Sequence, residues 1–232
     1  MARITRKELK TDKFALEIGH TVDFFEEHRT EIVRYAVAAL AVAVIAVLIF
    51  VYRSHQHTTR QDALAKAMAV QDAQVGAGAP GAVSYPTQEA KEKEEVKQFS
   101  EIAAKYSGSD EGYIAEYYLG CIAAGQGNLP EAEKRLSSVA NSAGKKYASL
   151  AKLPLGQIYF AEGKNDLGEK TLRSLLDDPT VFVSKDQAAL VLARMLAHTK
   201  PAEARKLLDP LRAKPGPVSQ NAIQAYAELP PQ

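Results

Sequence analysis

The longest hydrophobic pattern in the chain is an uninterrupted apolar run between Arg34 and Arg53. Between the tyrosines at its two ends, Tyr35 and Tyr52, it holds only Ala, Val, Leu, Ile and Phe. A helix needs roughly 20 residues to cross a bilayer core about 30 Å thick, and it satisfies all of its own backbone hydrogen bonds in lipid. The pattern therefore predicts a single transmembrane helix over residues 34–53, with aromatic and basic side chains at both interfaces.

Two other interpretations of this run are less consistent with its position and length. A cleavable signal has a shorter apolar region, lies nearer the N-terminus and ends in small residues, whereas this run ends in Phe-Val-Tyr-Arg. A core helix that is apolar on all sides is rare in a domain of this size. We therefore expect a span that is retained in the mature protein.

The orientation of the span follows from the basic residues beside it. The tail before it carries seven, and three lie close on the other side: Arg3, Arg6, Lys7, Lys10, Lys13, Arg29 and Arg34, then Arg53, Arg60 and Lys66. Lysine and arginine favour the cytoplasmic side, although within the nearest 15–20 residues or so the two sides are almost equal. The count over the whole tail predicts a cytoplasmic N-terminus and a C-terminal part outside the cytoplasm.

The segments that flank the span predict a tail and a stalk. Residues 1–33 form a basic tail, and apolar residues at helical spacing in it indicate an amphipathic helix on the membrane surface, a lead-in to the span or a partner-binding helix. Residues 54–87 read as an alanine-rich helical stalk followed by a Gly/Pro linker. The linker contains Gly-x-Gly-x-x-Gly at 76–81, but a dinucleotide site needs a strand before that motif and a helix after it. We interpret it as a flexible joint.

Residues 88–232 show helical periodicity and an internal repeat. The Val-Phe-Ile pattern from Val96 places one apolar face on the helix at 88–107, and the short Val-Phe-Val at 181–183 is too brief to indicate a strand. Four positions then recur every 36 residues in three copies. They are Leu119-Gly120, Leu155-Gly156 and Val191-Leu192; Ala132, Gly168 and Ala204; Leu136, Leu172 and Leu208; and Val139, Leu175 and Leu211. Turn residues separate the two halves of each copy, so each copy predicts helix, turn, helix.

This register resembles the tetratricopeptide repeat, which has Leu-Gly in the first helix and a small residue where the second helix crosses it. The period is longer than 34 residues, Leu192 replaces a glycine, and Pro154 lies where it would kink a helix or delay its start. The resemblance implies an all-α fold: one transmembrane helix, then an α-solenoid of about three helix pairs. The helix at 88–107 would cap one end, and a helix near Ser219–Leu229 would cap the other.

The resemblance also implies a candidate partner-binding groove, because the first helix of each repeat lines the concave side. The positions that would line it are Tyr117, Cys121, Leu153, Gln157, Phe160, Ala189, Ala193 and Leu196. They are mostly apolar, which is typical of a protein-binding surface. The alternative is that several of them pack beneath the N-terminal helix.

Composition and motifs give no sign of catalysis. The net charge of +1 and the 25% of charged residues do not indicate a basic nucleic-acid surface. Cys121 reads as a small buried residue, His55 and His57 are two apart on a helix and make a poor metal pair, and His198 suits a helix end. We expect no enzyme, no catalytic residues, no metal, no cofactor and no small-molecule substrate.

The complete layout resembles one family more narrowly. The basic opening Arg-Ile-Thr-Arg-Lys-Glu-Leu-Lys, the single span, the alanine-rich stalk and the repeats are similar to the ancillary SecYEG translocon subunit family (YfgM-like). This implies a single-pass protein of the bacterial inner membrane with periplasmic repeats, whose partners are translocon subunits, periplasmic chaperones or client proteins. Two alternatives stay open: a tetratricopeptide scaffold for cell division or envelope assembly, and a membrane-anchored enzyme that depends on Cys121 or His198.

Overall fold

The computed structural model describes residues 29–76 and 83–230 of the chain. The amphipathic helix expected in the tail and most of the glycine-rich motif lie outside these residues. Within the described residues there are nine helices and two strands of two residues each. The contacts divide the chain into residues 1–58 and residues 59–232, and we describe these two units separately.

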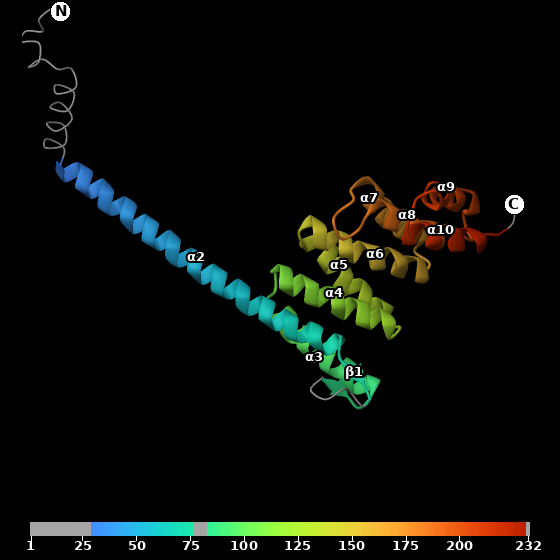
Figure 1. Cartoon of the computed structure of the whole chain (residues 1–232), viewed down its shortest axis with the longest axis horizontal. Coiled ribbons are helices and arrows are strands. Elements are labelled where there is room, and N and C mark those ends of the chain that lie inside the picture. The colour runs from blue at the N-terminus through green and yellow to red at the C-terminus, as the bar shows by residue number, and fades with distance from the viewer. Residues whose placement is uncertain (1–28, 77–82, 231–232) are drawn as a thin grey trace, which may run out of the picture. The chain divides into compact units, whose positions relative to one another are not determined.

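The first unit contains most of α2 (Arg29–Gln71), a helix of 43 residues. Figure 1 shows it as one continuous helix, and by length and composition it can cross a membrane. Its apolar side chains are exposed throughout the segment predicted to span; Leu40 and Phe50, for example, are 65% and 73% exposed. Exposure of this extent in water would be unfavourable, whereas lipid accommodates it.

The second unit, residues 59–232, is a stack of antiparallel helices (Figure 1). Its helices after α2 are α3 (Gln88–Lys105), α4 (Asp110–Gly125), α5 (Leu129–Ser142), α6 (Lys145–Ala161), α7 (Asn165–Asp177), α8 (Lys185–Leu196), α9 (Pro201–Arg212) and α10 (Pro217–Ala227). The pairs α4–α5, α6–α7 and α8–α9 are the three predicted copies. The prediction of an all-α fold with an apolar N-terminal helix and a repeat body is confirmed.

The repeat register arises from close packing inside each pair. A Cβ atom on Gly120 would lie 2.7 Å from Cγ of Leu136, and one on Gly156 would lie 2.6 Å from Cγ of Leu172. Both leucines are fully buried, so glycine lets the leucine of the second helix lie against the backbone of the first. The third pair has Leu192, also fully buried, in place of that glycine.

The turns inside the first two helix pairs require glycine for their backbone geometry. Gly127 and Gly163 follow α4 and α6 with φ of 77° and 75°, a left-handed conformation that other residues adopt at a cost. The third turn, after α8, has Thr199 at the equivalent position and is one residue longer.

The N-terminal end of this unit differs from the prediction of a single capping helix. Ala67 of α2 is fully buried in one apolar cluster with Phe99 and Ile102 of α3. The segment 59–71 and α3 therefore act as a further helix pair. Glu95 of α3 lies four residues before Phe99, at the position where the second helices of the three repeats carry a small residue. Its side chain is buried, and its Oε1 lies 3.8 Å from Lys91 Nζ.

Two further details correct expectations from the sequence. Pro154 lies inside α6, which runs from Lys145 to Ala161 without a break, so it does not delay the start of the helix. The linker is flanked by strands β1 (Gln74–Val75) and β2 (Ser84–Tyr85), which pair in parallel. The pairing of β1 with β2 holds the two ends of the glycine-rich segment together. The prediction of a flexible joint did not include this pairing.

Candidate functional site

The first helices α4, α6 and α8 carry the predicted groove residues, and the structure separates these into two groups. Ala189, Ala193 and Leu196 are at most 8% exposed. They lie in the same cluster as Ala222 and Ala225 of α10, which packs on α8. Burial under α10 therefore withdraws the α8 residues from a partner. The sequence left open that groove positions pack beneath the N-terminal helix. For the α8 residues, the helix that packs nearby is instead the C-terminal one, α10.

The other predicted groove residues keep an accessible part. Gln157 is exposed, and the rest are half-buried: Tyr117, Cys121, Leu153 and Phe160. Leu153 and Phe160 pack partly against the apolar cluster that α7, α8, α9 and α10 form. Tyr117 and Cys121 pack against the cluster that α4, α5 and α6 form. Contact of these residues with a partner stays a prediction.

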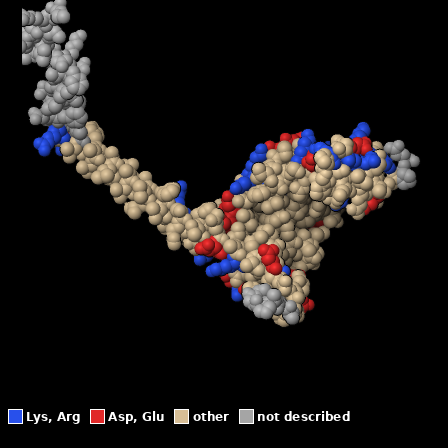
Figure 2. Space-filling view, viewed as in Figure 1, with Lys and Arg blue, Asp and Glu red and all other residues tan. Residues whose placement is uncertain are grey.

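The surface around these residues carries little charge. The last nine residues of α4 (117–125) and the last nine of α6 (153–161) contain no Asp, Glu, Lys or Arg. Figure 2 shows a broad area without charged side chains over the part of the unit that α4 and α6 occupy in Figure 1. An uncharged, partly apolar face of this kind is suited to burial against another protein.

Aromatic side chains add to this face, and one of them was missed in the sequence. Tyr118 stacks on Phe99 with ring centroids 4.9 Å apart, and its edge contacts Tyr117 at 5.3 Å. Tyr118 follows Tyr117 directly, so helical spacing alone placed it on a different face. The stacking on Phe99 of α3, a contact between two different helices, holds the Tyr118 ring beside Tyr117.

Cys121 shows none of the features of a reactive thiol. Burial raises its pKa, and a hydrogen bond with Tyr117 opposes this only in part. Burial likewise raises the pKa of Tyr117. A raised pKa keeps the thiol protonated and weakly nucleophilic at neutral pH. His198 is exposed at the end of α8, and no cluster of three metal-ligating residues occurs in the described part of the chain.

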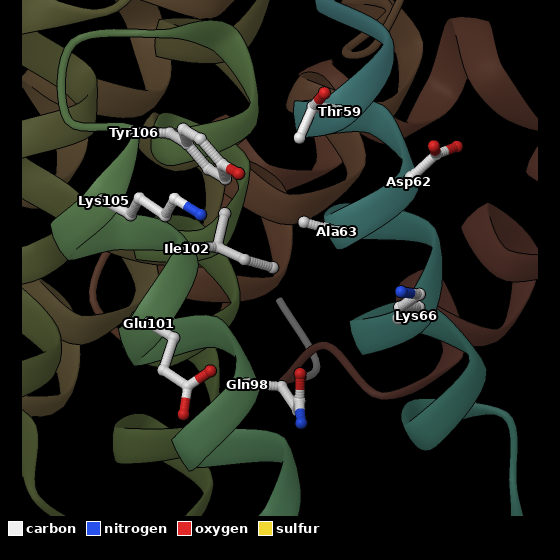
Figure 3. A pocket seen from close by; sticks show the side chains of 9 residues that line it. All are labelled: Thr59, Asp62, Ala63, Lys66, Gln98, Glu101, Ile102, Lys105 and Tyr106. Atoms are coloured by element: carbon white, nitrogen blue, oxygen red, sulfur yellow. The ribbon is translucent and has the colours of Figure 1, made fainter. Parts of the chain in front are cut away.

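A pocket of about 340 Å³ lies between the end of α2 and α3. Figure 3 shows Thr59 and Tyr106 toward one end, Lys66 and Gln98 toward the other, and Ala63 facing Ile102 between them. Its rim mixes both signs of charge, and its floor is formed by the apolar contact of the two helices. Nothing in this arrangement converges on one point, as catalysis would require.

Ion pairs repeat with the same period as the helices. Lys164 Nζ lies 2.7 Å from Glu133 Oε2, and Lys200 Nζ lies 2.8 Å from Glu169 Oε2. Both the lysines and the glutamates are 36 residues apart. Each pair joins the turn of one repeat to the second helix of the preceding repeat, so they fix the register between repeats.

We expect the Glu169 pair to make stability depend on pH in the acid range. The hydrogen bond from Lys200 is the main cause that lowers the pKa of Glu169 below its ordinary 4.5. The stabilisation is therefore present above pH 4.5 and is lost as the pH falls through the lower folded-state pKa. Urea unfolding from pH 7 to pH 3 should show Glu169→Gln less stable than the wild type at pH 7 only, with Glu101→Gln, at an exposed position of α3, as the control.

A family model described as a tetratricopeptide repeat-like domain matches residues 23–206. The chain belongs to this family. Members are in general non-catalytic modules for protein–protein interaction. No curated protein and no solved structure is significantly similar to the chain.

Proposed function

We propose that this tetratricopeptide repeat-like chain is a single-pass protein of the bacterial inner membrane, accessory to the SecYEG translocon. In this proposal its repeats lie in the periplasm and help to pass translocated proteins to periplasmic chaperones. The observation that carries it is the extent of the family match. The match begins at residue 23 and so includes the apolar segment of α2 together with the repeats.

The proposed arrangement has four parts: residues 1–33 as a cytoplasmic tail, 34–53 as the span, 54–87 as stalk and linker, and 88–232 as the repeat domain. The orientation is supported by the excess of lysine and arginine in the tail, because these residues favour the cytoplasmic side. The structure adds that residues 59–71 also pack with α3. We therefore place the working boundary of the repeat unit nearer residue 59.

Within the repeat unit, we propose that partners bind the uncharged face of α4 and α6. Its residues with accessible surface are Tyr117, Cys121, Leu153, Gln157 and Phe160. A face without charge suits a partner segment that is itself apolar, such as a chain that has not yet folded. A face without charges also contributes little electrostatic attraction to an acidic or basic peptide.

A topology experiment tests the membrane part of the proposal. Protease added to intact spheroplasts should degrade the repeat unit, because a periplasmic domain is accessible without lysis. Protection until lysis would place the repeats in the cytoplasm and contradict the handoff role. It would instead support a cytoplasmic scaffold tethered to the membrane.

Co-purification with the translocon tests the partner part. Gln157→Arg places a charge on the exposed centre of the proposed face, and we expect it to lower recovery of translocon subunits about tenfold if this is a central contact. Ser138→Arg, exposed on α5, is the matched control and should retain recovery. Equal recovery with both variants would remove this face from the proposal. Recovery of division or envelope-assembly proteins in place of the translocon would favour the alternative scaffold role.

A further inference from the structure

The loop between α7 and α8, residues 178–184, projects two apolar side chains into solvent. Val181 is 88% exposed and Phe182 is 43% exposed. The five residues from Pro179 to Val183 carry no charge. This is the longest of the connections that join one helix pair to the next, and the uncharged face of α4 and α6 does not include it.

Internal contacts hold this loop in its shape. Val183 is fully buried, and its backbone N–H donates to Thr180 Oγ1 at 3.1 Å, while Thr180 N–H donates to Val183 O at 2.9 Å. The Thr180 hydroxyl also lies 2.6 Å from Ser149 Oγ of α6. With its two ends anchored in this way, the loop displays Val181 and Phe182 outward as a fixed feature.

Phe182 has an aromatic neighbour and a recess beside it. Its ring lies 5.4 Å from that of Tyr147. A recess of about 500 Å³ next to them is lined by Gly144, Tyr147, Pro179 and Val181, with lysine and aspartate at its rim. We name Tyr147, Val181 and Phe182 the apolar tip.

A chain of contacts places the apolar tip on the edge of the unit where α2 enters. Arg60 lies 3.5 Å from Glu111 at the start of α4. Its neighbour Asp110 lies 4.0 Å from Lys146 at the start of α6, and Lys145 pairs with Asp178 of the loop. The N-termini of α4 and α6 therefore lie on one edge of residues 59–232, together with Arg60 and the loop.

This edge is also the part of the unit nearest the apolar segment along the chain. Arg60 follows Arg53, the last residue of that segment, by seven positions in the chain. Seven residues can span at most roughly 25 Å, so the chain tethers this edge close to the apolar segment. The opposite edge, where α7 begins, is separated from Arg60 by the length of a helix.

We propose that the apolar tip inserts into the surface of the bilayer that α2 crosses and so docks the repeat unit on the membrane. This inference rests on the proposed span. Apolar and aromatic side chains bury at the boundary of headgroups and acyl chains, about 5–10 Å deep. Few side chains insert, so the contact is weak for a free domain, but the tether raises its effective concentration greatly.

The ion pairs at the rim predict which lipids are needed. Lys145 pairs with Asp178, and Lys146 pairs with Asp110, so both lysines already have a carboxylate partner. Attraction to anionic lipid is therefore small, and insertion depends on the apolar side chains. Docking is expected on phosphatidylcholine alone.

Tryptophan fluorescence in the full chain tests the proposal, because the chain contains no tryptophan. Phe182→Trp places a single reporter in the apolar tip. Leu167→Trp is the matched control, since Leu167 is also 43% exposed but lies at the start of α7 on the opposite edge. In phosphatidylcholine vesicles, bromination of the acyl chains should quench the Phe182→Trp emission at least about twofold more than the control.

Two further variants make the outcomes decisive. Val44→Trp reports on the span: without quenching there, the span fails and the docking proposal fails with it. If Val44→Trp is quenched but Phe182→Trp and Leu167→Trp are quenched equally, the span is retained and the docking proposal is overturned. Adding Val181→Asp to Phe182→Trp should abolish the extra quenching while circular dichroism stays unchanged. An emission shift of Phe182→Trp that depends on protein density, without quenching, would indicate a protein contact and also overturn the proposal.

Discussion

Replacing Leu172 by alanine is expected to lower the free energy of unfolding by about 2–5 kcal/mol. Leu172 is fully buried in α7, and its side chain lies against the backbone of α6 at Gly156. Truncation leaves a cavity at the centre of the second pair, and the glycine opposite has no side chain to fill it. Urea unfolding followed by circular dichroism measures the change, with Leu167→Ala, 43% exposed on the same helix, as the control.

The glycine opposite Leu172 gives a second test of the same contact. Gly156→Ala should destabilise by roughly 1–3 kcal/mol through overpacking, although alanine by itself favours a helix. Gly125→Ala, where nothing lies within 4 Å of the new Cβ, should be neutral or slightly stabilising. The new methyl group partly fills the cavity that Leu172→Ala leaves. The double variant should therefore lose less free energy of unfolding than the sum of the losses in the two single variants. Additive losses would contradict the packing described for this pair.

Placing two arginines in the apolar segment should remove the chain from membranes. Val44→Arg and Leu48→Arg lie four residues apart near its middle, and each is expected to cost about 2.5–3.5 kcal/mol at the centre of a bilayer. Carbonate extraction of a membrane fraction should then recover most of the protein in the soluble phase, whereas the wild type stays with the lipid.

The control for this experiment lies on the same helix. Ala65→Arg and Ala69→Arg have the same spacing and are exposed, but they belong to the part of α2 that packs with α3. This variant should stay in the membrane fraction. If the two double variants behave alike, the apolar segment does not anchor the chain.

The features that the sequence alone established are those that depend on local pattern. The apolar run between Arg34 and Arg53 predicts a helix able to span, because length and continuous hydrophobicity need no tertiary partner. The 36-residue spacing of Gly120 and Gly156 predicts helix pairs, because each pair buries the same face in the same way. Both features recur in the described structure, and the family match agrees with the second.

Other features depended on contacts between segments far apart in the chain. Ala193 and Leu196 have the pattern of groove residues, yet α10 covers them, and no local spacing reveals which helix packs over another. Lys164 and Glu133 each read as an ordinary surface charge until the stacking of repeats brings them within 2.7 Å.

The loop with Val181 and Phe182 shows the difference most directly. The sequence offers only three apolar residues in a row, of which the structure buries Val183 and exposes the other two. The hydrogen bonds of Thr180 with Val183 and Ser149 decide that division. Local pattern thus determined which segments are helical and which can span, whereas tertiary packing determined which apolar side chains stay available, since exposure depends on what else the fold places above them.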